Sequence, residues 1–161
     1  MLRPYRLKEV EKLNYQFETD QGIIYTAYFL DYSTVFFDYG QLVDNIYSFN
    51  IDLIQGNTKN TLADSRIADT VVEIMKLFFE TNDNVAIYIC DSLDNRQLAR
   101  KRKFDRWFWK YNDGRIIKED QLAVVDGVSI YNTLLIRKDH QQAALFIEAF
   151  RELNARDHDN K

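Results

Sequence analysis

The sequence lacks most of the residues on which common catalytic and metal-binding sites depend. It has 161 residues but one cysteine, Cys90, and two histidines, His140 and His158. A single cysteine excludes an internal disulfide and any CxxC metal or redox motif. The two histidines are too far apart in sequence to form an HxxxH or HExxH zinc pair, so we expect no metal and no cofactor.

Glycine and proline are also scarce, with five glycines and one proline, Pro4. The glycines are too scattered for a dinucleotide-binding GxGxxG motif or a phosphate-binding GxxxxGK[ST] loop. No GxSxG sequence is present to hold a serine nucleophile. Because no segment has the composition of a linker, we expect a single domain over residues 1–153 and a polar tail over residues 154–161.

Long hydrophobic runs are absent as well. No apolar stretch approaches the roughly 20 residues that a membrane-spanning helix needs. The first residues, Met1 to Glu9, contain no apolar core of a signal peptide. We therefore expect a protein that makes no membrane contact and resides in the cytoplasm.

Hydrophobic residues make up 46% of the chain and aromatic residues 14%, a composition typical of a folded globular protein. Alternating polar and apolar residues predict strands near residues 15–17, 23–30 and 46–54, and residues 32–37 are predicted to be a short strand or an irregular edge. Residues 85–90 are apolar throughout, which indicates a strand that is covered on both faces or central in the sheet. Asp126-Gly127 predicts a hairpin between strands over residues 116–125 and 128–136.

Helical periodicity predicts three helices. The first begins after Asp64 or Ser65, the second covers residues 95–111, and the third follows a capping box formed by Asp139 and Gln142. The predicted order is β-β-(β)-β-α-β-α-β-β-α. Hairpins at both ends of this order predict an α+β fold with a mainly antiparallel sheet and helices packed on it.

The most unusual segment is the basic helix over residues 96–110. It contains seven basic residues and one acid, Asp105, for a net charge of +6 within a chain whose formal charge is −4. The other 146 residues therefore carry −10. This uneven distribution of charge affects which partners the protein can bind, but it does not determine the fold.

Two interpretations of this helix stay open. In the structural one, Arg100 pairs with Asp91 or with carbonyl groups at the end of the central strand, and the helix overhangs the sheet. In the functional one, cations line a site for an anion with Trp107 as one wall, because an unpaired guanidinium is too costly to bury. The candidate binding residues are Asp91, Arg96, Arg100, Lys101, Lys103 and Trp107. The remaining bases, Arg102, Arg106 and Lys110, form an outward row.

Cys90, Asp91 and Arg100 also permit a different hypothesis, a hydrolase or nuclease. A thiol beside a helix N-terminus can act as a nucleophile, although a free cysteine most often fills a buried apolar position. Asp91 and Asp94 can hold Mg²⁺, although both also suit the capping of a helix. We assign no catalytic residue and favour a protein that is not an enzyme.

Several short motifs resemble a family of small uncharacterised proteins from Bacteroidota-type bacteria, a domain of unknown function. The matching pieces are Tyr88-Ile89-Cys90-Asp91-Ser92-x-Asp94-x-Arg96-Gln97 with Arg100, Arg102, Phe104 and Trp107-Phe108 after it, Tyr15-x-Phe17-x-Thr19 with Gly22-x-x-Tyr25, Ile67-Ala68-Asp69-Thr70-Val71, and Tyr131-x-x-Leu134-Leu135-Ile136. The resemblance implies a stand-alone bacterial domain and carries no established activity.

The sequence therefore favours a binding or interaction domain that uses the basic helix. The partner is an anionic ligand, a nucleic acid or an acidic protein. The rival is a homo-oligomer in which this helix contacts the acidic remainder of another copy.

Overall fold

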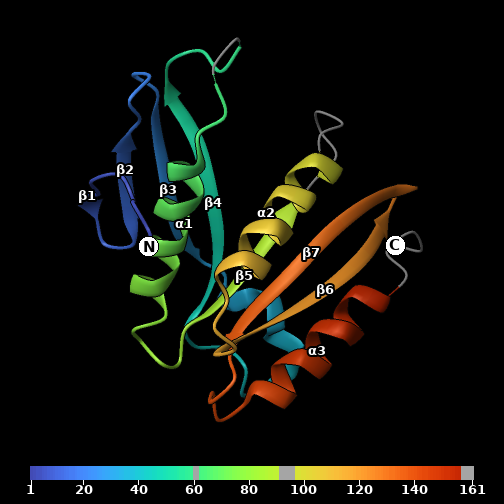
Figure 1. Cartoon of the computed structure of the whole chain (residues 1–161). Coiled ribbons are helices and arrows are strands. Elements are labelled where there is room, and N and C mark those ends of the chain that lie inside the picture. The colour runs from blue at the N-terminus through green and yellow to red at the C-terminus, as the bar shows by residue number, and fades with distance from the viewer. Residues whose placement is uncertain (60–61, 91–96, 157–161) are drawn as a thin grey trace. The chain divides into compact units, whose positions relative to one another are not determined.

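A computed structural model describes residues 1–59, 62–90 and 97–156 of the chain (Figure 1). Its strands are β1 (Lys8–Glu11), β2 (Asn14–Glu18), β3 (Ile24–Asp31), β4 (Ile46–Gln55), β5 (Val85–Cys90), β6 (Ile116–Val125) and β7 (Val128–Arg137). Its helices are the 3₁₀ helix η1 (Ser33–Tyr39) and the α-helices α1 (Ser65–Phe78), α2 (Gln97–Tyr111) and α3 (Ala143–Ala155). The strands form one sheet in the order β1-β2-β3-β4-β5-β7-β6. The predicted α+β class with a mainly antiparallel sheet is confirmed.

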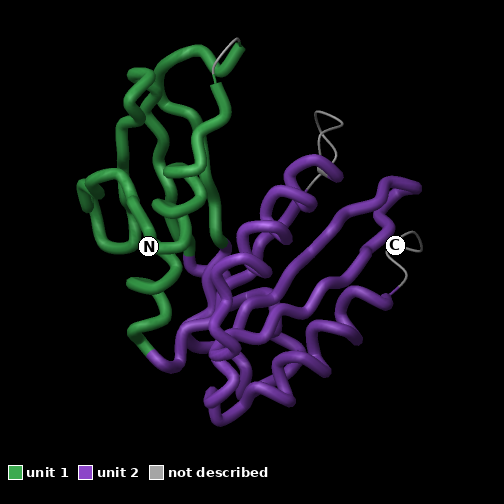
Figure 2. The backbone as a smooth tube through the Cα atoms, in the orientation of Figure 1, with its two compact units in different colours: residues 1–30, 49–81 green, residues 31–48, 82–161 purple. Residues whose placement is uncertain are grey.

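The chain divides into two compact units, one over residues 1–30 and 49–81 and the other over residues 31–48 and 82–161 (Figure 2). Strand β4 contributes residues to both. We describe each unit by itself, and the single domain over residues 1–153 stays a prediction.

The first unit has an aromatic core between its strands and α1. Phe29 of β3 stacks on Phe78 of α1 with ring centroids 4.0 Å apart, and Phe49 of β4 lies 5.2 Å from Phe29. Asp64 caps α1, as predicted, by accepting a 3.0 Å hydrogen bond from the backbone N–H of Arg66. This bond satisfies one of the amide groups that the first turn of a helix leaves free.

In the second unit, β5, β7 and β6 form a sheet with α2 on one face and α3 on the other (Figure 1). Because side chains alternate along a strand, Val85 and Ile87 of β5 point to the α3 face, where they pack with Phe146 and Phe150. Tyr88 points to the opposite face, where its ring stacks 4.5 Å from that of Phe104 in α2. β5 is thus central in the sheet, as one of the two predicted alternatives has it, although Ile89 near its C-terminal end is 41% exposed.

The N-terminal half differs from the prediction in two elements. Residues 33–39 form the 3₁₀ helix η1 rather than a strand, because Phe36 and Tyr39 recur at a spacing of three and Phe36 is fully buried. Strand β1 was not predicted, because its four residues, Lys8-Glu9-Val10-Glu11, are all exposed and carry no apolar alternation.

The start and end of α3 also correct the prediction. No capping box forms: Gln142 is the N-cap residue without a side-chain hydrogen bond, and Asp139 accepts hydrogen bonds from Arg137 instead. The helix continues to Ala155, so Asn154 does not belong to a polar tail. Its side chain is buried and donates a 2.8 Å hydrogen bond to the carbonyl of Phe150.

The predicted hairpin between β6 and β7 is confirmed. Asp126 and Gly127 both have positive φ, 51° and 75°. Two consecutive left-handed residues are typical of the type I′ turn, whose twist matches that of the strands it joins. Within residues 1–59, 62–90 and 97–156, no helix is long and apolar enough to span a membrane.

Candidate functional site

The predicted site residues fall into two groups. Asp91 and Arg96 lie outside the described residues, as does Asp94. Arg100, Lys101, Lys103 and Trp107 all lie on α2, the helix that packs on the face of β5, β7 and β6 formed by Tyr88, Cys90 and Tyr131. The structure therefore brings the helical part of the predicted site onto one side of the second unit.

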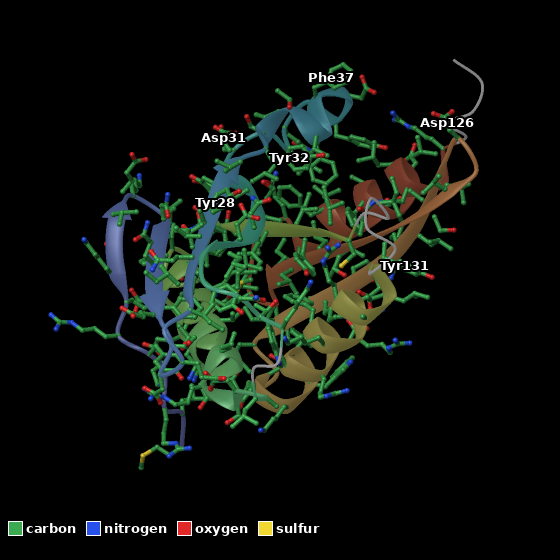
Figure 3. The ribbon with its side chains drawn as sticks, turned by 90° about the horizontal axis from the view of Figure 1, so that it is seen from above. Tyr28, Asp31, Tyr32, Phe37, Asp126 and Tyr131 are labelled. Carbon is green, nitrogen blue, oxygen red and sulfur yellow. The ribbon has the colours of Figure 1, made fainter. Side chains whose placement is uncertain are left out.

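Lys101 faces the sheet rather than the solvent. Its ammonium lies 2.6 Å from Asp105 on the next turn and 4.0 Å from Asp120 of β6. The ring of Tyr131, labelled on β7 in Figure 3, lies 5.9 Å from the same Nζ. Lys101 thus belongs to an internal charge cluster that connects α2 to the sheet.

Lys118 of β6 is the most buried member of this cluster, with a side chain 2% exposed. Its Nζ lies 2.6 Å from Oδ1 of Asp105 and also pairs with Asp120. Oδ1 of Asp105 accepts no hydrogen bond of regular geometry, and the short distance to Lys118 makes this contact an ion pair. Thr133 donates a 2.7 Å hydrogen bond to the other end of the cluster, at Oδ1 of Asp120.

We call Lys101, Asp105, Lys118 and Asp120 the charge cluster. Burial raises the pKa of Asp105, but the nearby ammonium groups of Lys101 and Lys118 outweigh this effect and hold that pKa below its usual value. Burial lowers the pKa of Lys101, but the carboxylates of Asp105 and Asp120 raise it by more. The pKa of Lys101 therefore lies above its usual value. The cluster therefore stabilises the charged forms of Asp105 and Lys101, and its two cations balance its two anions.

Asp105, Lys118 and Asp120 were not predicted from the sequence to be partners of Lys101. Two signals were present. Lys101 and Asp105 have the i, i+4 spacing of a helical ion pair. Lys118 and Asp120 are charged residues two positions apart in a strand, so they share one face. Only the packing of α2 against β6 joins the two pairs.

The inward position of Asp105 determines the charge of the outward face of α2. We call this surface the basic face, and it consists of the exposed residues Arg102, Lys103, Arg106, Trp109 and Lys110. Asp105 is the only acid on the helix, so no carboxylate from α2 lies on the basic face. Among the described residues, no acid lies within ion-pair distance of these four cations.

Aromatic side chains accompany these cations. Trp109 is 71% exposed. Nζ of Lys103 lies 5.3 Å from the ring of the half-buried Trp107, and Nζ of Lys110 lies 5.1 Å from the ring of Tyr111. The basic face thus combines unpaired cations with a large apolar ring that is open to solvent.

Arg100 is half-buried beside the C-terminal end of β5. It takes part in interactions there, and its positive charge acts on the thiol of Cys90. The sequence-based alternatives of an ion pair and an anion site at Arg100 both remain predictions.

Cys90 is a buried thiol, 2% exposed. Burial raises its pKa, and the opposing effects of a hydrogen bond with Tyr88 and of the charges of Arg100 and Lys101 are smaller. A raised pKa disfavours the thiolate, which is the nucleophilic form. Within the described residues, no group of three or more His, Cys, Asp or Glu side chains has an arrangement suited to a metal ion.

We expect Cys90 to react with a thiol reagent at pH 8 about 100-fold more slowly in the native protein than in concentrated urea, because burial limits both access and ionisation. Stopped-flow absorbance with a chromogenic disulfide reagent measures both rates. Equal rates would contradict the burial of this thiol and would favour Cys90 as a reactive group.

The fold and the charge cluster define a small, mainly antiparallel α+β protein with a basic helix on one face of its sheet. Residues 63–152 match the model of a family of unknown function (DUF6169). The match covers more than half of the chain, from just before α1 into α3, so the chain belongs to this family. The resemblance to an uncharacterised family is thereby confirmed, whereas the bacterial origin stays a prediction. No curated protein matches the chain.

Proposed function

We propose that the protein is a non-catalytic binding domain whose basic face binds single-stranded nucleic acid. The observation that supports this proposal is the set of four exposed cations on α2 that no carboxylate in the described part of the chain neutralises. Exposed cations of this kind can replace the counterions condensed around the phosphates of a nucleic acid, and the release of those counterions favours binding.

The aromatic residues favour nucleic acid over other polyanions. Proteins that bind single strands combine a positive surface for the phosphates with aromatic rings on which bases stack. Trp109 offers such a ring, 71% exposed and adjacent in sequence to the cation Lys110. A surface that serves only solubility does not need an exposed tryptophan, because burying an indole is favourable.

An acidic protein surface is the second candidate, since it also complements four cations. Such a partner relies on charge pairs and has no requirement for base stacking. The cytoplasmic location expected from the sequence belongs to this proposal as well, because both candidate partners are present there.

Titration of a labelled oligothymidylate against the protein, followed by fluorescence anisotropy at several salt concentrations, tests the proposal. We expect the logarithm of the binding constant to fall linearly with the logarithm of salt concentration. If all four cations contact phosphates, the slope is about −3, from roughly −0.7 per contact with a single strand. Tryptophan fluorescence should decrease in the same titration, because a base stacks on Trp109.

A polyglutamate of matched charge serves as the comparison ligand. Binding to polyglutamate with equal affinity and without tryptophan quenching would favour the acidic protein surface. Undetectable binding of both ligands at low salt would overturn the proposed function.

A further inference from the structure

The two ends of the sheet differ in how they are protected against pairing with another strand. One edge strand, β1, has four residues, three of them charged, and its register with β2 shifts between Glu9 and Glu11. The other edge strand, β6, has ten residues and pairs with β7 in one continuous register without a bulge. Short, charged and bulged edges resist association, whereas long regular ones invite it.

The hydrogen-bonding pattern between β6 and β7 shows which residues of β6 have backbone N–H and C=O groups that do not bond to β7. The N–H of Lys138 donates a 2.8 Å hydrogen bond to the carbonyl of Arg115, so the odd-numbered residues of β6 exchange hydrogen bonds with β7. The even-numbered residues, including Leu122 and Val124, direct their N–H and C=O groups away from β7. In the described parts of the chain, no group bonds to these outward atoms of Leu122 and Val124.

The side chains divide β6 into a protected half and an open half. In the first half, Lys118 and Asp120 belong to the charge cluster and Glu119 pairs with Arg151 at 2.5 Å. An inward-pointing charge such as that of Lys118 is a device by which edges are protected. In the second half, Leu122 is 49% exposed and Val124 45% exposed, and no charge lies between them.

We propose that the open half of β6 is an interface for a second copy of this chain, which pairs its own β6 antiparallel to the first across a two-fold axis. Leu122 then exchanges two backbone hydrogen bonds with Val124 of the second copy, and Val124 does the same with Leu122 of the second copy. The same pairing brings four apolar side chains together on one face of the joined sheet.

The self-complementary pattern is what favours a second copy over a segment of another protein. In this antiparallel register Leu122 lies opposite Val124 of the second copy and Ala123 lies opposite Ala123, so apolar residues match apolar residues from Leu122 to Val124. The charged residues of β6, Lys118, Glu119 and Asp120, already have partners of opposite charge within the chain, so they do not select a differently charged peptide.

This interface goes beyond the proposed function and does not depend on it. A two-fold axis that relates antiparallel edge strands of one sheet is perpendicular to the sheet, so it keeps like faces on the same side. Both α2 helices therefore lie on one face of the joined sheet. If the basic face binds a nucleic-acid strand, two such faces act on it together.

Sedimentation velocity over a range of protein concentrations, without nucleic acid, tests the interface. We expect a monomer–dimer equilibrium in the wild type and a dissociation constant at least about tenfold weaker for the Leu122→Lys/Val124→Lys variant, because ammonium groups then oppose each other at the interface. Leu145→Lys is the matched control: it replaces a leucine of similar exposure (43%) on α3 and should leave the equilibrium unchanged. A wild type that is monomeric at every concentration would overturn the proposal.

Amide hydrogen exchange distinguishes edge pairing from any other dimer. As concentration rises, the N–H groups of Leu122 and Val124 should become protected, whereas those of Gln121 and Ala123 are already bonded to β7 and should change little. A dimer in which neither Leu122 nor Val124 gains protection would contradict pairing at β6. Either result leaves the binding of nucleic acid by α2 as a separate question.

Discussion

We expect the variant Arg102→Glu/Arg106→Glu to bind single-stranded nucleic acid about 100-fold more weakly than the wild type at low salt. This variant reverses two charges on the basic face. Each substitution removes a phosphate contact and adds a repulsive carboxylate. Both residues are exposed and separated by one helical turn, so their loss leaves the core of the second unit intact. The salt slope should also become shallower by about 1.4, from roughly 0.7 per lost contact.

A matched control separates this local effect from the change in net charge. The variant Lys12→Glu/Lys138→Glu makes the same change of net charge at two exposed lysines outside α2. It should retain most of the affinity, because neither lysine belongs to the basic face. Equal losses in the two double variants would show that binding depends on overall charge and would count against a site on α2.

Trp109→Ala completes the comparison. Removal of a stacked aromatic ring costs about 1–3 kcal/mol per base and leaves the number of phosphate contacts unchanged. We therefore expect weaker binding with an unaltered salt slope, the opposite signature to that of the charge reversal. An unchanged affinity would contradict the stacking of bases on Trp109. The basic face would then recognise only the negative charge of its partner.

The second large effect concerns stability. We expect Lys118→Met to lower the free energy of unfolding by about 2–4 kcal/mol, measured by urea denaturation. The substitution leaves Asp105 and Asp120 with Lys101 as their only cation in the charge cluster, and removing one partner of a buried ion pair leaves an uncompensated charge. Lys110→Met, at an exposed position of α2, is the control and should stay within about 0.5 kcal/mol of the wild type.

Adding Asp105→Leu to Lys118→Met should recover part of the loss, since replacing a buried ion pair by apolar side chains is often neutral. The double-mutant cycle then gives the interaction energy of the two residues. Single losses that simply add in the double variant would show that Lys118 and Asp105 do not interact.

The same cluster sets the pH range in which this stabilisation is available. The folded pKa of Asp105 is lowered, so its contribution is present above its unfolded value and is lost as pH falls below about 4. The folded pKa of Lys101 is raised, so its contribution is present below its unfolded value and is lost as pH rises above about 10.5. The difference in stability between wild type and Lys118→Met should therefore be largest between these limits and shrink towards acid.

Local pattern predicted much of the fold because the relevant information lies within a few neighbouring residues. The all-apolar run Val85–Cys90 predicted an interior strand of the sheet, and Asp126-Gly127 predicted a hairpin, at whose turn both residues adopt positive φ. The errors occurred where a local signal competes with long-range packing. Asp139 was predicted to cap a helix, but it accepts hydrogen bonds from Arg137 instead. Phe36 lies in a segment that was predicted to be a strand or an irregular edge, but it is buried in the core as part of a 3₁₀ helix.

The candidate site divides in the same way. The amino-acid sequence by itself determined that positive charge concentrates on one helix and that two tryptophans accompany it. The tertiary structure alone decided which of these charges are available. It turns Lys101 and Asp105 inward to Lys118 and Asp120, residues 13 to 19 positions further along the chain, and leaves Arg102, Lys103, Arg106 and Lys110 outside. A helical pattern specifies which residues share a face, but the strand packed beneath it determines which face is buried and which charges are neutralised there.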